Sequence, residues 1–538
     1  MDGSYNYTME LGPPTPIPPD DGKLQKVITM RQFTIMALSS SIGAGLLLAT
    51  YSSLAVGGPG SLLVSFAVVG CAVWATMCAL GELSAAIPVS GSFYEYSVRL
   101  ISPAWGFAMG WNYVVNFVFI IVFELVVILL CVRYWDPLAP AHFVLPSFIL
   151  ALVLVNAFGA RGYAETENLF AACKTLVLST FIIVALLITI RQVPSDKRPA
   201  EEVGINLWKQ DAFKNGAFGF LYVFMAAGMA YGGTEMLGLT AAECEYPERV
   251  MPLACKIVPV RIAWLYLLPI LMLGFVLRVP LTEAIQSNGI SPFVAAMDQA
   301  GLPELASAFN GIIIVAVFSM ASASVFASSR ALQAISARGM GPACLAKVKW
   351  GYPMPALALV FAISLLSLVK IAKGGDKVFD WLLALAAGSN YFTWISICAS
   401  HIRLRLAIRR QGLEEAEVLR WKSPPGITGS ALAILVFGFG LVAQVVAAVR
   451  SPLPKPPHFL ASVLGCIVVV VLWAGYMVVV RRRGGGSPLL IPIGEIDLKT
   501  GMGVEMERGR ERDVERDVES VESVPVSVPV SMRTVIMR

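Results

Sequence analysis

Twelve apolar stretches run along this chain of 538 residues, and most approach the roughly 20 residues with which an α-helix crosses a bilayer. Hydrophobic residues make up 57% of the chain and charged residues only 14%, which is too apolar for a soluble core. We therefore expect an all-α integral membrane protein. The expected spans are residues 33–56, 62–86, 104–131, 143–158, 169–190, 217–242, 260–279, 308–328, 356–372, 379–400, 429–448 and 459–480.

Charge placement predicts the orientation of these spans. Residues 1–30 are polar and rich in proline, and the first apolar run is too long for a signal peptide, so the first span is expected to be retained. With both ends in the cytoplasm, the inner segments up to residue 483 hold 22 Lys and Arg residues and the outer ones 12. This positive-inside excess predicts cytoplasmic termini. It also accounts for the net charge of +5, so we expect no nucleic-acid partner.

Reactive side chains are sparse. The nine cysteines lie in or beside apolar spans without metal-like spacing, and the three histidines lie near span ends without forming a cluster. The sequence therefore predicts neither a metal nor another cofactor, and it disfavours an enzyme.

Composition divides the chain into three parts. We expect a cytoplasmic amino-terminal tail at 1–30, one twelve-helix membrane domain at 31–480, and a disordered cytoplasmic carboxyl-terminal tail at 481–538. The last part repeats ERDV, ESV and VPVS, a biased polar composition that buries no core. A regulatory tail and a merely solvated one both fit this composition.

The first and sixth apolar stretches are interrupted by glycine-centred polar segments, at residues 39–45 (SSSIGAG) and 231–235 (YGGTE). Glycine in a membrane helix commonly lets two helices approach closely, so either segment alone fits simple packing. Two interruptions in corresponding positions of two five-helix halves, however, indicate a secondary transporter's substrate site. Backbone freed at membrane depth also needs protein or a wet cavity to satisfy it.

Broken helices offer opposite partial charges to a ligand. Free N–H groups at a half-helix amino end suit a carboxylate, while exposed carbonyls suit an ammonium group. A zwitterionic amino acid satisfies both, and it is the predicted substrate.

The chain resembles the fungal amino acid permeases of the yeast amino acid transporter type, within the amino acid–polyamine–organocation superfamily. The similarity runs from about residue 29 to residue 412 and returns at EIDLKTG in the tail. It rests on SIGAGLLL, GGPGSLL, ALGELSAAIPVSGSFYEYSVRLISPAWGFAMGWNY, YGGTEMLGLTAAECEYPERVMP, SPFVAAMDQAG and FDWLLALAAGSNYFTWISICASHIRLR. The resemblance implies a five-plus-five inverted repeat with broken helices 1 and 6, two further terminal helices, and proton-coupled import of amino acids at the plasma membrane.

Substrate-binding residues are predicted at both interruptions and on two neighbouring helices. Asn116 either lines the pocket together with Trp111 or bonds between helices. Ser322 and Ser324 stand where the family commonly has Asn and Asp, and Ala44 stands where it usually has Thr, so the resemblance does not predict which amino acid is carried. The predicted set is Ser41, Ile42, Gly43, Ala44, Gly45, Asn116, Tyr231, Gly232, Gly233, Thr234 and Ser322.

Three ionisable residues in apolar stretches are candidates for proton coupling or gating, because charges are costly in lipid. Glu235 closes the second interruption; its alternative role is a structural hydrogen bond to freed backbone. Glu124 lies in mid-helix, where low dielectric favours its neutral form. Lys174 follows Glu167 by seven residues and by resemblance approaches the helix 1 interruption, although it can also snorkel to the surface. Glu82 is expected to pair with Arg or Lys at the cytoplasmic end of helix 2, outside the site.

These features predict an importer that works by alternating access, with amino acid and proton binding linked. Two alternatives from other classes are a receptor that binds amino acids with little transport, and a channel, which the paired interruptions disfavour. Within transport, the nearest rival is an exchanger of cationic amino acids on an internal membrane.

Overall fold

A computed structural model of the chain forms an all-helical fold in the part that it describes. Within that part, the only β-type pairings are two isolated bridges, one joining Ile28 to Cys244 and one joining Lys349 to Tyr352. The structure describes residues 27–39, 41–87, 89, 91–191, 204–205, 208–209, 212–244, 247–277, 291–349, 351–371, 388–449, 459–484 and 486–498.

The first two apolar stretches form three helices. Helix α1 (Met30–Ser39) and the single turn α2 (Ala44–Leu47) flank the first interruption, and α3 (Ala49–Ala86) follows after one residue. A kink at Gly58, with φ of +77°, divides α3, and Pro59 follows directly. Because proline lacks an N–H and glycine adopts positive φ freely, the chain turns there without a loop.

Helix is present in every one of the twelve predicted stretches. Among the residues that the structure describes, seven helical segments are long and apolar enough to span a membrane, so the all-α membrane fold is confirmed and the count of twelve stays a prediction. The remaining elements of the first half are α4 (Phe93–Leu100), α5 (Pro103–Val132), α6 (Ala141–Ala157) and α7 (Gly159–Arg191). Those of the second half include α9 (Gly216–Ala230), α10 (Met236–Ala241), α11 (Pro247–Arg261), the π-helix η2 (Ile262–Leu267), α12 (Leu268–Val276), α14 (Pro292–Gln299) and α15 (Pro303–Ala337). After them come the 3₁₀ turn η3 (Ala343–Ala346), α16 (Met354–Ser364), η4 (Leu365–Ile371), α18 (Ser389–Arg410), α19 (Glu415–Val418), α20 (Gly426–Val449), α21 (Phe459–Arg482) and η5 (Ile493–Glu495).

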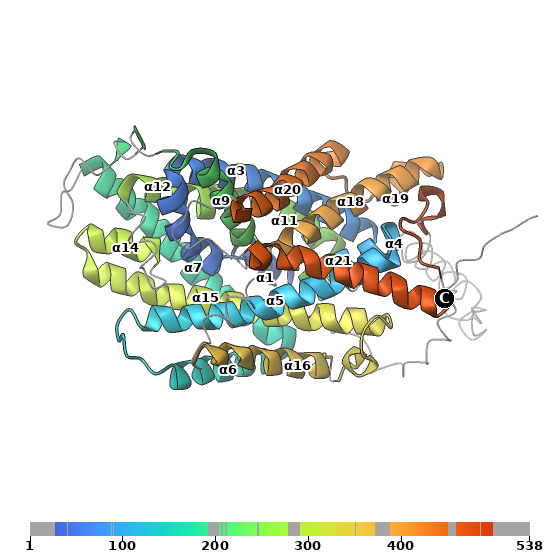
Figure 1. The fold of residues 1–538 in the computed structure, drawn as a ribbon, viewed down its shortest axis with the longest axis horizontal. Coiled ribbons are helices and arrows are strands. Elements are labelled where there is room, and N and C mark those ends of the chain that lie inside the picture. Colours follow the sequence, from blue (N-terminus) through green and yellow to red (C-terminus); the bar gives the residue numbers. More distant parts are fainter. Residues whose placement is uncertain are drawn as a thin grey trace, which may run out of the picture.

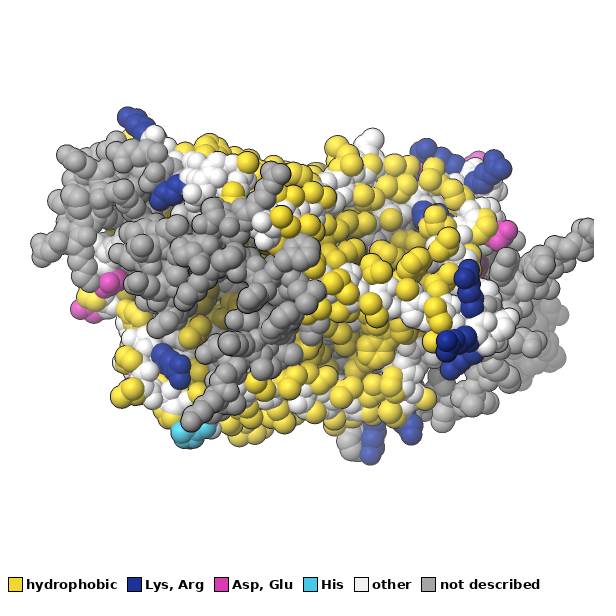
Figure 2. Space-filling view, in the orientation of Figure 1, with side chains coloured by type: hydrophobic (Ala, Val, Ile, Leu, Met, Phe, Trp, Pro, Cys, Tyr) yellow, Lys and Arg dark blue, Asp and Glu magenta, His cyan; other side chains and the backbone are white. Residues whose placement is uncertain are grey.

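The helices form two groups that meet around the interruptions. In one group α5 packs along α15, with α6 and α16 at its edge (Figure 1). In the other, α3 packs against α9, α11 and α20. Figure 2 shows hydrophobic side chains over the middle of one face and Lys and Arg towards its two ends. This distribution is typical of a protein whose middle faces lipid.

The start of the carboxyl-terminal tail differs from the expected disorder. Ile496 and Leu498 are buried, and the amide of Ile491 donates to the carbonyl of Ile101, at 2.9 Å. The amide of Gln411 on α18 donates to the carbonyl of Ile496, at 2.8 Å. Apolar side chains within a polar segment provide this anchor. Residues 499–538 lie outside the described residues.

Candidate functional site

The first interruption places a backbone amide inside the protein without a backbone carbonyl to accept from it. Between α1 and α2 the chain leaves helical geometry, and Gly43 is extended with φ of −143° and ψ of −158°. The Ala44 N–H therefore has no carbonyl partner in a preceding turn. Both Glu124 carboxylate oxygens, at 3.2 and 3.3 Å, accept from it instead. A side chain on Gly43 would come within 2.7 Å of Glu124 Oε1, so this approach requires glycine.

The second interruption lies where the sequence predicts it, at residues 231–235, between α9 and α10. Gly233 has φ of +92°, a conformation that L side chains rarely adopt. The Thr234 hydroxyl donates to the carbonyl of Tyr231, at 2.8 Å. A polar side chain thus satisfies part of the freed backbone.

A small cavity, about 20 Å³ in volume, lies between the two interruptions. That is room for about one water molecule. Five of the predicted site residues line it, namely Ser41, Gly43, Gly45, Glu124 and Gly232. Two methionines, two other apolar residues and one alanine complete the wall, which comprises Ile120, Phe123, Met229, Ala230 and Met320.

Tyr266 of η2 contacts the first interruption and the end of α9, just before the second. Its hydroxyl lies 3.2 Å from Ser41 Oγ and 3.3 Å from the carbonyl oxygen of Ala230. The ring stacks on Tyr231 with 4.5 Å between centroids. The hydroxyl of Tyr231 in turn donates to the carbonyl of Phe66 in α3, at 3.0 Å.

Lys174 is fully buried on α7 and forms an ion pair with Glu167, at 3.2 Å. The other carboxylate oxygen of Glu167 accepts from Ser319 of α15, at 2.5 Å. Lys174 also lies near enough to Glu124 for the two charges to interact. It does not snorkel, because its side chain has no exposed surface. Three buried ionisable side chains, those of Glu124, Lys174 and Glu167, therefore extend away from the cavity.

Glu235 is buried at the start of α10 but does not line the cavity. One of its oxygens accepts from the indole N–H of Trp394 in α18, at 2.9 Å, and the other has no hydrogen-bond partner among the described residues. An incompletely bonded buried carboxyl group is a candidate for proton uptake.

Two of the predicted substrate-binding residues bond to other helices. The Asn116 amide donates to Asn390 Oδ1 of α18, at 2.8 Å, and so bonds between helices. Ser322 accepts from the Asn156 amide of α6, at 3.2 Å. Neither residue lines the cavity, where α15 contributes Met320. On a helix, residues two apart face different directions, which explains why Ser322 turns away when Met320 points inward.

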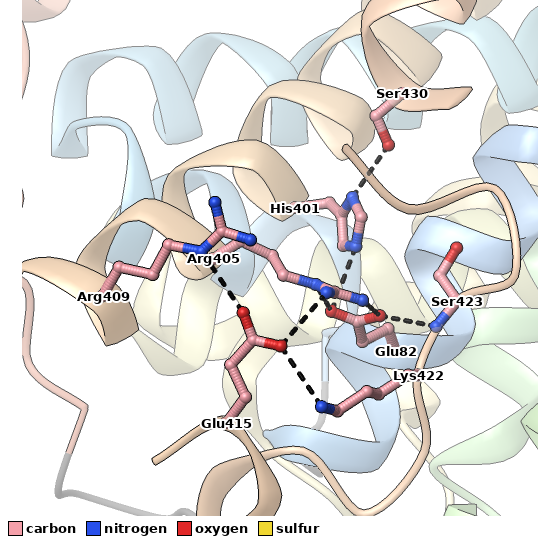
Figure 3. A network of polar contacts seen from close by, with 8 residues as sticks. All are labelled: Glu82, His401, Arg405, Arg409, Glu415, Lys422, Ser423 and Ser430. Atoms are coloured by element: carbon pink, nitrogen blue, oxygen red, sulfur yellow. Dashed lines mark hydrogen bonds and ion pairs between the residues drawn. The ribbon is translucent and has the colours of Figure 1, made fainter. Parts of the chain in front are cut away.

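Glu82 forms a separate buried network at the far end of α3 (Figure 3). Arg405 of α18 donates to both of its oxygens, each at 2.6 Å, which confirms the expected pairing with a basic residue. The backbone amide of Ser423 donates to the same carboxylate, at 2.6 Å, and His401 Nε2 lies 3.1 Å from it. This network joins α3 to α18 and the segment before α20, and it lies outside the cavity.

Two charged residues of this region were not predicted as site residues. Arg261, counted among the cytoplasmic positive charges, is fully buried between the two interruptions. Glu167 is the partner of Lys174. Both had a signal in the sequence: Arg261 falls within an expected span, and a spacing of seven residues places Glu167 and Lys174 on one helix face.

Paired broken helices around a cavity, in a fold of long apolar helices, define a membrane transporter. The chain matches the amino acid permease family over residues 32–484 and belongs to that family.

Similar fungal proteins cover most of this chain. Amino-acid permease inda1 of Hypocrea atroviridis is 35% identical over 84% of this chain and 81% of its own length. General amino-acid permease GAP2 of Candida albicans is 35% identical over 84% and 78%. Cationic amino acid transporter 1 of Schizosaccharomyces pombe is 34% identical over 85% and 79%. The family is one of amino acid transporters in membranes.

Proposed function

We propose that this chain imports amino acids across the plasma membrane together with protons, with both termini in the cytoplasm. The observation that carries the proposal is the Ala44 amide, which already binds a carboxylate, that of Glu124, at the edge of the cavity. A substrate carboxylate has the same chemistry and would compete for that N–H.

The small volume of the cavity supports alternating access rather than a channel. The cavity holds about one water molecule, so the helix groups must move apart to admit an amino acid. A small site between two interruptions fits a cycle in which one helix group rocks against the other.

Coupling to protons is proposed for Glu124, Lys174 and Glu235. All three are buried, and burial penalises the charged form of each, so a change of neighbours can change protonation. Glu167 extends the proposed set, because it is the ion-pair partner of Lys174. Proton and substrate must then favour the same conformational step.

The test is uptake of labelled amino acids by cells that lack their own permeases, at acid and neutral external pH and with a protonophore. We expect accumulation above the external concentration, collapse with the protonophore, and loss of accumulation in Glu235→Gln and Lys174→Met. Glu304→Gln, which alters an exposed carboxylate at the start of α15, is the control and should accumulate substrate normally.

Uphill uptake that survived both changes would contradict the proton role. Saturable binding without flux would indicate a receptor instead. Uptake that required cells preloaded with amino acids and did not depend on external acid would indicate an exchanger. We consider this alternative because the chain is similar to a cationic amino acid transporter.

A further inference from the structure

A single buried arginine bonds to the end of α1, just before the first interruption, and to the second interruption. Arg261 ends α11 and has no exposed surface. Its Nη1 donates to the carbonyl of Ala37 in the last turns of α1, at 3.2 Å. Its Nη2 donates to the hydroxyl of Thr234 in the second interruption, at 2.7 Å. One guanidinium group therefore links α1, the second interruption and α11.

The environment of this guanidinium is unusual for a buried cation. Within the described residues, no carboxylate forms an ion pair with it, and its Nε has no hydrogen-bond partner. Tyr266, Tyr231 and Glu235 are the neighbours that act on the charge without a hydrogen bond to it. Because a buried charge is costly without compensation, oxygen atoms of the interruptions must supply much of its stabilisation.

A backbone carbonyl at a half-helix end and a hydroxyl are the oxygens that hold a hard cation in transporters with broken helices. Here the side chain of Arg261 occupies the space between them. We propose that Arg261 is a resident cation that fixes the end of α1 to the second interruption, so that the transport site takes no metal ion at this place. This inference rests on the proposed function, because the experiments that test it measure transport.

The chemistry of arginine suits this role and separates it from Lys174. A guanidinium group does not deprotonate in proteins, whereas a buried lysine readily gives up its proton. Arg261 thus supplies a constant charge, while Lys174 is available for proton exchange. The fork of N–H groups also reaches two oxygens at once, which fixes α1 and the second interruption relative to α11.

The first arm of the test is sodium dependence. Wild-type uptake should be unchanged when external sodium is replaced by choline. Arg261→Ala should reduce uptake at least about tenfold, because two acceptors and Glu235 lose their cation. Addition of guanidinium or sodium ions should restore part of that uptake. Arg261→Lys, which keeps the charge, should retain more uptake than Arg261→Ala.

A milder change covers the case in which Arg261→Ala does not fold. Thr234→Val removes the acceptor for Arg261 together with the bond from the hydroxyl to the Tyr231 carbonyl, and it should lower uptake several-fold while the protein still reaches the membrane. Thr240→Val is the matched control, because the Thr240 hydroxyl is equally buried but donates to Met236 within its own helix.

The inference is overturned if wild-type uptake requires sodium, or if Arg261→Ala keeps at least about half of it. It is also overturned by a combination of three results. Arg261→Lys would have uptake as low as Arg261→Ala, added cations would restore uptake in neither variant, and Thr234→Val would have the same uptake as Thr240→Val. Absence of uptake by the wild-type protein would instead refute the proposed function.

Discussion

At the scale of single residues, the Glu167–Lys174 ion pair compensates two buried charges of α7. Both side chains are fully buried, and they neutralise each other at 3.2 Å. A buried pair contributes little net stability, but removal of one partner leaves an uncompensated charge. The pair therefore matters most when it is broken.

We expect Glu167→Gln to lower the free energy of unfolding by roughly 3–5 kcal/mol and to impair uptake, because Lys174 loses its counter-charge. Thermal unfolding of the purified protein in detergent checks the stability, and labelled uptake checks the activity. The double variant Glu167→Gln with Lys174→Met should recover stability, since no charge is left unpaired.

Glu415→Gln is the control for that experiment. Glu415 pairs with Arg409 and Lys422, whose side chains are 59% and 50% exposed, and at 3.6 Å with Arg405, which keeps its two bonds to Glu82 when Glu415 is changed. The loss of Glu415 should therefore cost at most about 1 kcal/mol. The basic neighbour Lys422 also holds the pKa of Glu415 below its usual value. Acid should thus weaken this contact as the carboxylate becomes protonated. Equal destabilisation by both variants would contradict the account of the buried pair.

At the scale of elements, the approach of α2 to α9 depends on the absence of a side chain. A Cβ on Gly45 would lie 2.8 Å from the backbone Cα of Ala230. Backbone atoms cannot rotate out of the way, so the helices would have to separate. The lining of the cavity would separate with them, since both residues belong to it.

Gly45→Ala should therefore destabilise the protein by about 1–3 kcal/mol and reduce uptake. Gly438→Ala, in α20, is the matched control because nothing lies within 4 Å of a Cβ there. It should be neutral or stabilise the helix by roughly 0.5–1 kcal/mol. Unfolding temperature and uptake of the two variants can be compared directly, and equal behaviour would refute the close-approach argument.

Elements were predictable where the signal is local. The interruption at residues 231–235 was found because glycines and polar residues stand within an apolar run. Helix α11 begins at Pro247 rather than at the expected residue 260, because its interior contains Pro252 and Pro259, which normally indicate loops. Helix α7 likewise begins ten residues early, in a polar stretch.

Long-range pairing was not predictable in the same way. The contacts of Arg261 with Ala37 and of Trp394 with Glu235 join residues 224 and 159 positions apart. One sequence contains no information on which side chains of separate helices meet. The resemblance to the permease family predicted the helices around the site. Packing between helices determined that Asn116 and Ser322 bond to other helices and do not line the cavity.

At the scale of the whole molecule, the proposed orientation places the segment between α15 and α16 in the cytoplasm. Cys344 lies there in η3 and is exposed. In a variant whose only cysteine is Cys344, a membrane-impermeant maleimide should label intact cells weakly and permeabilised cells strongly.

The opposite surface supplies the control for this labelling. Asp136 is exposed in the segment between α5 and α6, which should face outside. Asp136→Cys in a cysteine-free background should react in intact cells. Strong labelling of Cys344 before permeabilisation would reverse the proposed orientation.

The small volume of the cavity bears on how inhibitors of this protein are sought. Computational screening against rigid walls would reject every amino acid, because about 20 Å³ admits little more than one water molecule. Met229 and Met320 belong to those walls, and methionine is unbranched and repacks readily. Compound libraries should therefore be screened with these two side chains free to move. A compound that wedges them apart would trap the transporter open on one side.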